Sequence, residues 1–87
     1  MYPSLESDFE WRTNAKGNHV LICGDSLRAT VFFNKYCWCI IINGFPANSI
    51  VADEYFEDAE RAQWRAEAIV QGKAKDAVLK PLKPRPY

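Results

Sequence analysis

The residues best suited to chemistry are two cysteines, Cys37 and Cys39, which flank a tryptophan in the run KYCWCIIING at residues 35–44. Thiols ligate metals, form disulfides or pack as small apolar groups. His19, the single histidine of the chain, is a further candidate metal ligand. Which of these chemistries is available depends on how the surrounding strands place the side chains.

Short strands followed by one helix are predicted around these residues. The helix should begin after Asp58, a good N-cap, and end before Gly72, which suits the position that follows a helix. The prolines after residue 79 cannot continue a helix and predict an extended segment. Runs rich in β-branched and aromatic residues predict strands at 9–13, 19–23, 26–33 and 36–43, with 49–52 suited to a short fifth strand.

These elements predict an α+β fold: an antiparallel four-stranded β-meander, with at most a short fifth strand, one α-helix packed on one face and an extended Pro-rich C-terminal tail. The 87 residues are divided into a loose N-terminus at 1–8, a single β-meander/helix domain at 9–72 and a basic Pro-rich tail at 73–87. The side chains expected in the core are Trp11, Val20, Ile22, Leu27, Ala29, Val31, Phe33, Trp38, Ile40, Ile42, Phe56, Ala62, Ala66 and Ile69.

A two-residue turn at Asn34 and Lys35 would set the register of the two strands that it joins, with Phe33 opposite Tyr36. One face of this hairpin is then almost wholly apolar and should receive the helix. The second face carries Arg28, Thr30, Phe32, Asn34, Lys35, Cys37, Cys39 and Ile41.

This register gives the cysteines no chemistry of their own. Strand neighbours two apart are about 6.6–6.8 Å apart at Cα, at the far edge of disulfide reach. A turn at residues 24–25 would leave His19 about 10 Å from Cys39, whereas zinc holds each ligand at about 2.0–2.3 Å. We therefore expect no metal and no cofactor, and we expect the cysteines to pack or to face a partner.

Catalysis has little support in the sequence. His19 has no evident serine or cysteine nucleophile with a third, orienting group. The acidic pair Glu57 and Asp58 stands at a predicted helix start, where the helix dipole and capping explain it. We expect a protein that is not an enzyme.

Charge and hydropathy exclude further classes. Eleven basic side chains balance eleven acidic ones, and a net charge of zero argues against a protein that coats polyanions. The longest apolar run, residues 36–42, is far shorter than the roughly 20 residues of a membrane helix. The first residues lack the pattern of a signal peptide, and three cysteines suit a reducing compartment. We expect a cytoplasmic protein with no membrane partner.

An acidic block is the first candidate for a binding surface. It consists of Asp53, Glu54, Glu57, Asp58 and Glu60. Such a run is either a solvated surface or a site that meets basic residues of a partner, where charge complementarity speeds association.

The other candidates are apolar. Trp64 lies about 200° around the helix from Ala62, so it points away from the predicted apolar stripe and is either a partner anchor or covered by the tail. On the second sheet face, Phe32, Ile41 and Arg28 form a patch that either binds a partner or a second copy, or is covered by the tail or the first strand.

The pattern over residues 9–71 resembles a broad class of small phage and mobile-element proteins that have a β-meander followed by a helix. The resemblance rests on Trp11, Gly17-Asn18, Ala29-Thr30-Val31-Phe32, Trp38, Ile42-Asn43-Gly44, Phe56 and the alanines Ala59, Ala62 and Ala66. Some members of this class are anti-CRISPR proteins, which inhibit a bacterial immune complex by binding it. The resemblance implies a protein-binding inhibitor and assigns no functional residues.

The sequence thus predicts a non-enzymatic protein that binds a host protein or ribonucleoprotein complex and occludes it by its bulk and charge, as a phage-encoded inhibitor of host defence. One alternative is a small nucleic-acid-binding module that uses its sheet face, with the basic tail on phosphates. A homodimer that associates through the patch at Phe32 and Ile41 is another, so the chain is expected to be a monomer or a homodimer.

Overall fold

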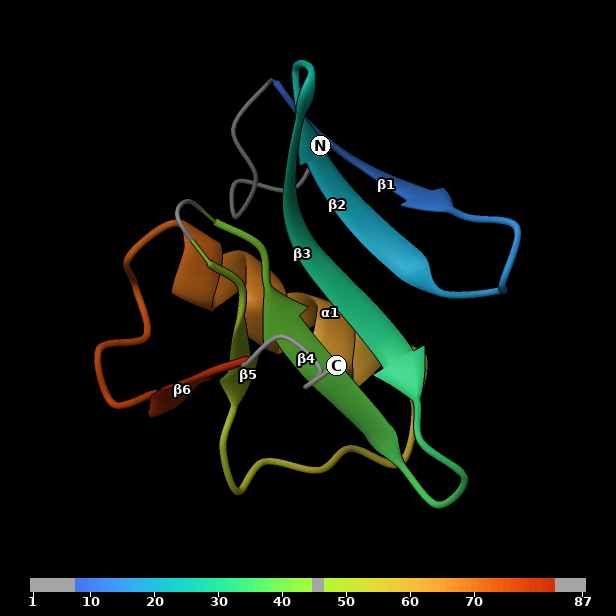
Figure 1. Ribbon diagram of the computed structural model, residues 1–87, viewed down its shortest axis with the longest axis vertical. Helices are drawn as coiled ribbons and strands as arrows, with labels where there is room; N and C mark the ends of the chain where they lie inside the picture. Colours follow the sequence, from blue (N-terminus) through green and yellow to red (C-terminus); the bar gives the residue numbers. More distant parts are fainter. Residues whose placement is uncertain (1–7, 45–46, 83–87) are drawn as a thin grey trace, which may run out of the picture.

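The computed structural model describes residues 8–44 and 47–82 and contains one antiparallel sheet crossed by one helix (Figure 1). The strands are β1 (Phe9–Thr13), β2 (His19–Cys23), β3 (Ser26–Phe33), β4 (Trp38–Ile42), β5 (Ser49–Val51) and β6 (Leu79–Pro81), and the helix α1 (Ala59–Val70) lies between β5 and β6 in the chain. Strand order in the sheet follows chain order. The α+β class and the antiparallel meander are confirmed, but the sheet has six strands where four or five were predicted.

The sixth strand comes from the segment that was predicted as an unpaired tail. β6 pairs with β5, and the ladder is flanked by bonds from the N–H of Ala52 to the carbonyl of Val78 (2.8 Å) and from the N–H of Leu82 to the carbonyl of Asn48 (2.9 Å). Pro81 has no N–H to contribute, which an edge strand tolerates. The remainder of the predicted tail, residues 83–87, and the N-terminal residues 1–7 lie outside the described residues.

The helix forms where local signals predict it. The Asp58 carboxylate accepts a hydrogen bond from the N–H of Arg61 (2.8 Å), which satisfies one of the free donors of the first turn. At the other end Gly72 adopts φ +73°, and the N–H of Lys73 donates to the carbonyl of Ala68 (2.8 Å). This is a Schellman motif, which ends the helix at the predicted place.

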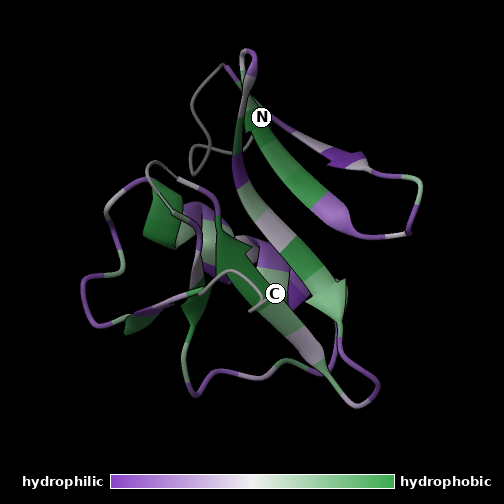
Figure 2. Ribbon diagram, viewed as in Figure 1, coloured by the Kyte–Doolittle hydropathy of each residue, from purple (hydrophilic) through white to green (hydrophobic). Residues whose placement is uncertain are grey.

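α1 lies across one face of β2, β3 and β4, as Figure 1 shows. Ala62 and Ala66 are fully buried, and their small side chains let the helix approach the sheet closely. Hydrophobic residues concentrate on these central strands (Figure 2). The core consists of Leu21, Ala29, Val31, Ile40, Val51, Ala62 and Ala66, with Phe9, Trp11, Trp38, Ile42, Phe56, Ile69 and Val70 packed around it.

A β-bulge between β2 and β3 changes which residues of β2 face the helix. Ile22 pairs with Leu27 near the turn, as predicted, but beyond the bulge Leu21 pairs with Ala29, one residue out of step. Leu21 is consequently fully buried in the core, and its strand neighbour Val20 points to the opposite face. Val20 is nevertheless buried, as predicted, although it lies outside the main core cluster. The predicted core positions of Ile22 and Leu27 are wrong, because Ile22 is half-buried outside that cluster and Leu27 is exposed.

The register of β3 and β4 differs by two residues from the predicted one, since Phe33 pairs with Trp38 and not with Tyr36. The cause is the side chain of Asn34, whose Oδ1 accepts from the N–H groups of Tyr36 (3.3 Å) and Cys37 (3.2 Å). The chain therefore reverses over four residues. Because side chains alternate along a strand, a shift of two leaves the paired residues on their predicted faces.

Candidate functional site

The turn between β3 and β4 gathers aromatic side chains at one end of the sheet. The loop before α1 returns to this end, because Trp38 and Phe56 exchange backbone hydrogen bonds with N–O distances of 2.8 and 3.1 Å. Tyr55, next to Phe56, is thereby brought to the hairpin. We refer to Phe32, Phe33, Tyr36, Trp38 and Tyr55 as the aromatic end.

Three rings of the aromatic end are largely exposed: Phe33 is 52% exposed, Tyr36 88% and Tyr55 66%. Trp38 is half-buried, and its ring centroid lies 5.4 Å from that of Phe33 and 5.5 Å from that of His19. Tilted and edge-to-face pairs at this spacing are favourable. Phe33 lies here and not in the core as predicted, and Tyr36, predicted to face the helix, lies in the turn.

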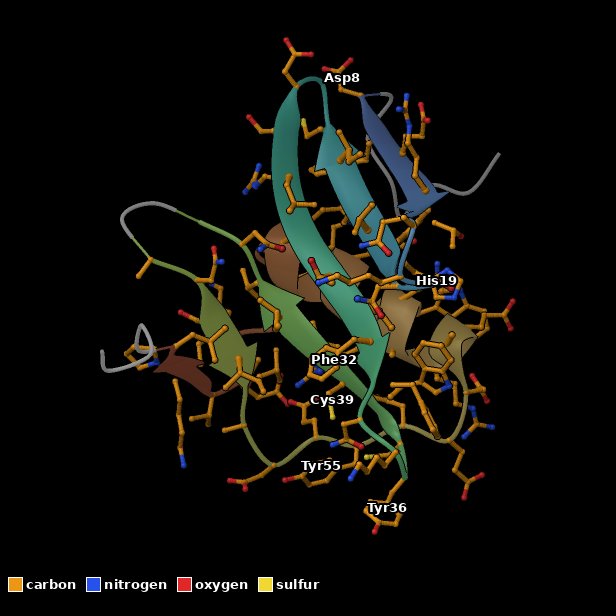
Figure 3. All side chains as sticks on the ribbon, turned by 45° about the vertical axis from the view of Figure 1, so that its right-hand side comes forward. Asp8, His19, Phe32, Tyr36, Cys39 and Tyr55 are labelled. Carbon is orange, nitrogen blue, oxygen red and sulfur yellow. The ribbon has the colours of Figure 1, made fainter. Side chains whose placement is uncertain are left out.

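A hollow of about 280 Å³ opens at the aromatic end, on the sheet face away from the helix. Phe32 and Tyr55 line it together with Cys39, as the labelled side chains in Figure 3 indicate. Asp53 and Lys80 place opposite charges on its wall. The volume is close to the lower limit of small-ligand pockets, which suits a single large side chain of a partner.

One carboxylate of the predicted acidic block is already bound within the molecule. Glu54 receives two hydrogen bonds from Arg65, at 2.7 and 2.9 Å, and Arg65 also contacts Asp76 at 3.2 Å. The side chains of Glu54 and Arg65 are only 23% and 24% exposed. These bonds raise the pKa of Arg65, and its guanidinium lowers the pKa of Asp76. Glu54 therefore ties the loop to α1 and is not presented to a partner.

The other four members of the acidic block are exposed. Asp53 has φ +61° in the turn after β5, which aspartate tolerates better than most residues, and it lines the hollow. Asp58 caps the helix and contacts Arg61 at 3.5 Å. Glu57 and Glu60 stand on either side of this cap. The structure thus brings part of the acidic block to the aromatic end.

Trp64 is 60% exposed, and it shares a ridge of α1 with Glu67, three residues further along. Glu67 is 7% exposed, and its Oε2 accepts a hydrogen bond of 2.7 Å from the indole Nε1 of Trp11. This bond joins the ridge to β1. Trp64 therefore lies on the helix side of the sheet, whereas Phe32, the other predicted apolar anchor, lies on the opposite face.

The three residues of the predicted patch on the second face do not line one hollow. Ile41 is half-buried between Thr30 and Ile50 in the middle of the sheet. Arg28 is half-buried and lines a different hollow, with Asn43. Of the three residues of the patch, Phe32 alone reaches the aromatic end.

The thiols of Cys37 and Cys39 lie 3.9 Å apart and are not bonded to each other. Asn34 contacts both, donating from Nδ2 to Cys39 Sγ (3.2 Å) and accepting from Cys37 Sγ (3.4 Å). Burial, with a smaller effect of the Cys37 thiol, raises the pKa of Cys39 from 9.0 to about 11. His19 packs against Trp38 on the helix side, so it is not brought to the thiols.

No family model matches the chain, and the searches of curated proteins and of solved structures found no similar protein. In the part of the chain that the structure describes, no helix combines the length and the apolar character needed to cross a bilayer.

Tyr36 and Tyr55 belong to the candidate site but were missed as binding residues in the sequence. Both had a usable local signal. Tyr36 directly follows the turn residues Asn34 and Lys35, and Tyr55 stands among acidic residues, where burial is rare. That the two tyrosines lie at the same end of the molecule depends on the contact between Trp38 and Phe56, which no local pattern predicts.

Proposed function

We propose that this protein acts by binding another protein through its aromatic end. The observation that carries the proposal is the exposure of Phe33, Tyr36 and Tyr55 at one end of the sheet, where Phe33 also packs against Trp38. Tyrosine, phenylalanine and tryptophan are enriched at protein interfaces, where they act as anchors. Single exposed rings are common on protein surfaces, but a group of them marks an interaction site.

The charges beside the aromatic end favour a protein over a nucleic acid. Asp53, Glu57 and Glu60 are exposed near it and would repel a phosphate backbone. On β1, the guanidinium of Arg12 is paired with Glu10, which reduces its value as a phosphate contact. A partner surface with one apolar side chain for the hollow and basic residues around it would complement this end of the molecule.

As the finer proposal, the partner is a component of a host defence complex, and the protein is a phage-encoded, anti-CRISPR-like inhibitor that acts in the host cytoplasm. Support comes from the resemblance of residues 9–71 to small phage proteins, together with the absence of a catalytic constellation in the sequence. The action would be steric, because a small rigid domain bound at the aromatic end blocks a surface that the complex needs.

The test compares affinity capture by the wild-type protein, a Tyr36→Ala/Tyr55→Ala variant and a Leu27→Ala control. Leu27 is also an exposed apolar side chain, but it stands near the opposite end of β3. If each tyrosine contributes about 2 kcal/mol, the double variant should bind its partner roughly 1,000-fold more weakly. The control should bind like the wild type.

Two outcomes would overturn the proposal: partner binding that survives in the double variant, and captured material that is removed by nuclease and moderate salt. The finer proposal is tested in cells by the plating efficiency of a phage on a CRISPR-immune host. Wild-type protein should restore plaques and the double variant should not; failure of the wild-type protein on hosts with each immune type would refute inhibition of these complexes.

A further inference from the structure

We propose that Cys37 and Cys39 together chelate a soft, thiophilic metal ion, Cu(I). This goes beyond the proposed protein-binding function and does not depend on it. The pair is held at the base of the β3–β4 turn, at the same end of the molecule as the tyrosines but with its own chemistry.

The separation of the two sulfur atoms fits a shared metal ion. Two metal–sulfur bonds of about 2.3 Å place the sulfurs roughly 3.8 Å apart at a tetrahedral angle and about 4.6 Å apart when the arrangement is linear. The observed 3.9 Å between Cys37 Sγ and Cys39 Sγ lies near the tetrahedral value, and a linear arrangement requires the sulfurs to separate by roughly 0.7 Å more. A disulfide would need the sulfurs to approach to about 2.05 Å. Bridging by a metal therefore demands less movement than oxidation.

The side chain of Asn34 provides the outer support that metal-binding thiolates need. Its Nδ2 donates to Cys39 Sγ at 3.2 Å, and its Oδ1 is fixed by the N–H groups of Tyr36 and Cys37. The N–H donor therefore has a set direction toward the sulfur. Such outer partners orient ligands and stabilise the charge on a bound thiolate.

Charge and access also suit a monovalent ion. Binding of Cu(I) by two thiols releases two protons and forms a unit of net charge −1, since each sulfur binds as thiolate. The N–H donor of the Asn34 amide offsets part of this charge, and the hollow that Cys39 borders carries one opposite pair of charges, Lys80 and Asp53. Cys37 is half-buried and Cys39 borders the hollow, so an ion can reach the pair from solvent.

The ligand count favours Cu(I) over Zn(II). Zinc in structural sites takes four ligands, and residues 8–44 and 47–82 contain no cluster of three or more His, Cys, Asp or Glu side chains able to hold a metal. Soft thiolates select Cu(I), which accepts as few as two of them.

The experiment titrates the full chain with Cu(I) under anaerobic conditions against a chromophoric Cu(I) chelator. Wild-type protein should bind one ion per chain. Cys37→Ser should weaken binding at least about 100-fold. Cys23→Ser is the matched control, because Cys23 is the last residue of β2 and pairs with Ser26 at the start of β3, away from the β3–β4 turn. Asn34→Asp keeps the acceptor oxygen of the turn but removes the N–H donor, so it should weaken binding about 10- to 100-fold.

Cys37→Ser is preferred to a change at the buried Cys39 because it leaves the core untouched, and thermal unfolding of each variant verifies the fold. Three results would overturn the proposal: equal Cu(I) binding by wild type and Cys37→Ser, one ion shared by two chains, or a single free thiol in the unfolded, unreduced protein. The last result would mean that two of the three cysteines are joined as a disulfide, and any such bond uses Cys37 or Cys39 and removes the pair of thiols.

Discussion

Trp11 and Glu67 form a polar contact between β1 and α1 that the sequence does not reveal. The indole N–H donates to a carboxylate whose residue is only 7% exposed. A glutamate on a helix is normally solvated, and its burial here follows from the approach of β1 to the helix ridge. Hydrogen bonds to charged groups are among the stronger ones in a protein.

Trp11→Phe should therefore lower the free energy of unfolding by about 1.5–3 kcal/mol, since an aromatic ring, although a smaller one, remains and the N–H donor is lost. Trp64→Phe is the matched control, because Trp64 is 60% exposed, and it should change stability by less than about 0.5 kcal/mol. Urea unfolding measures both. Equal effects of the two substitutions would show that the bond to Glu67 contributes nothing.

Cys39 should make stability depend on alkaline pH. Its pKa is raised from 9.0 to about 11, so above pH 9 the unfolded chain releases a proton that the folded chain keeps. The contribution is fully present below pH 9, decreases as pH rises toward 11, and amounts to at most about 2–3 kcal/mol. Unfolding of wild type and Cys39→Ala at pH 8 and pH 10.5 measures it. The wild type should lose more stability over this interval; identical losses would contradict the assignment.

At the scale of elements, β6 shows how a proline can take part in a sheet. The bonded pairs Ala52–Val78 and Asn48–Leu82 lie four residues apart on each strand. Because bonded and non-bonded pairs alternate in an antiparallel ladder, Lys80 occupies the bonded position between them and Pro81 a position whose missing N–H is not needed. A proline-rich segment can thus close the edge of the sheet.

Moving the proline by one residue tests this arrangement. Lys80→Pro should remove a ladder hydrogen bond and detach β6. The free energy of unfolding should fall by roughly 3 kcal/mol, or the free energy of protection of the Ile50 amide should fall by a comparable amount. Pro81→Ala should cost less than about 1 kcal/mol, because the bonded positions are kept. Hydrogen exchange read by NMR distinguishes the two variants. Equal protection of Ile50 in both would mean that Lys80 does not pair as stated.

The molecule as a whole is neutral, but its charges and aromatic rings are not evenly spread. The helix shields one face of the central strands, and the exposed rings gather at the end of the sheet where the β3–β4 turn lies. Glu57 and Glu60 stand at the start of α1, next to this end. The helix start and the turn therefore form one surface, although twenty residues separate them in the chain.

Reversing the charge of that surface tests the electrostatic part of the proposed function. Glu57→Lys with Glu60→Lys should slow association with a basic partner about tenfold or more at low salt, with a smaller effect at high salt. Glu54 is unsuitable for this test because it is bound to Arg65. Surface plasmon resonance against the captured partner measures the rates. An unchanged association rate would show that the acidic residues do not meet the partner.

The sequence by itself determined the features that depend on near neighbours in the chain. The ends of α1 follow from the Asp58 cap and from the positive φ of Gly72, and the alanine stripe follows from helical periodicity. The faces of β3 and β4 were predictable although the register was wrong, because a shift of two residues preserves the alternation. The α+β class follows from the order of these local signals.

Only the tertiary structure decided what depends on distant pairing. The bulge opposite Leu21 exchanges the faces of β2, since one extra residue reverses the alternation. The pairing of β6 with β5 and the bridge from Trp38 to Phe56 join segments 18 or more residues apart. The candidate site follows from that bridge, which brings Tyr55 to the hairpin. Local residue preferences carry no information about which distant strand a segment will meet, and for this reason the aromatic end was not predictable from the sequence.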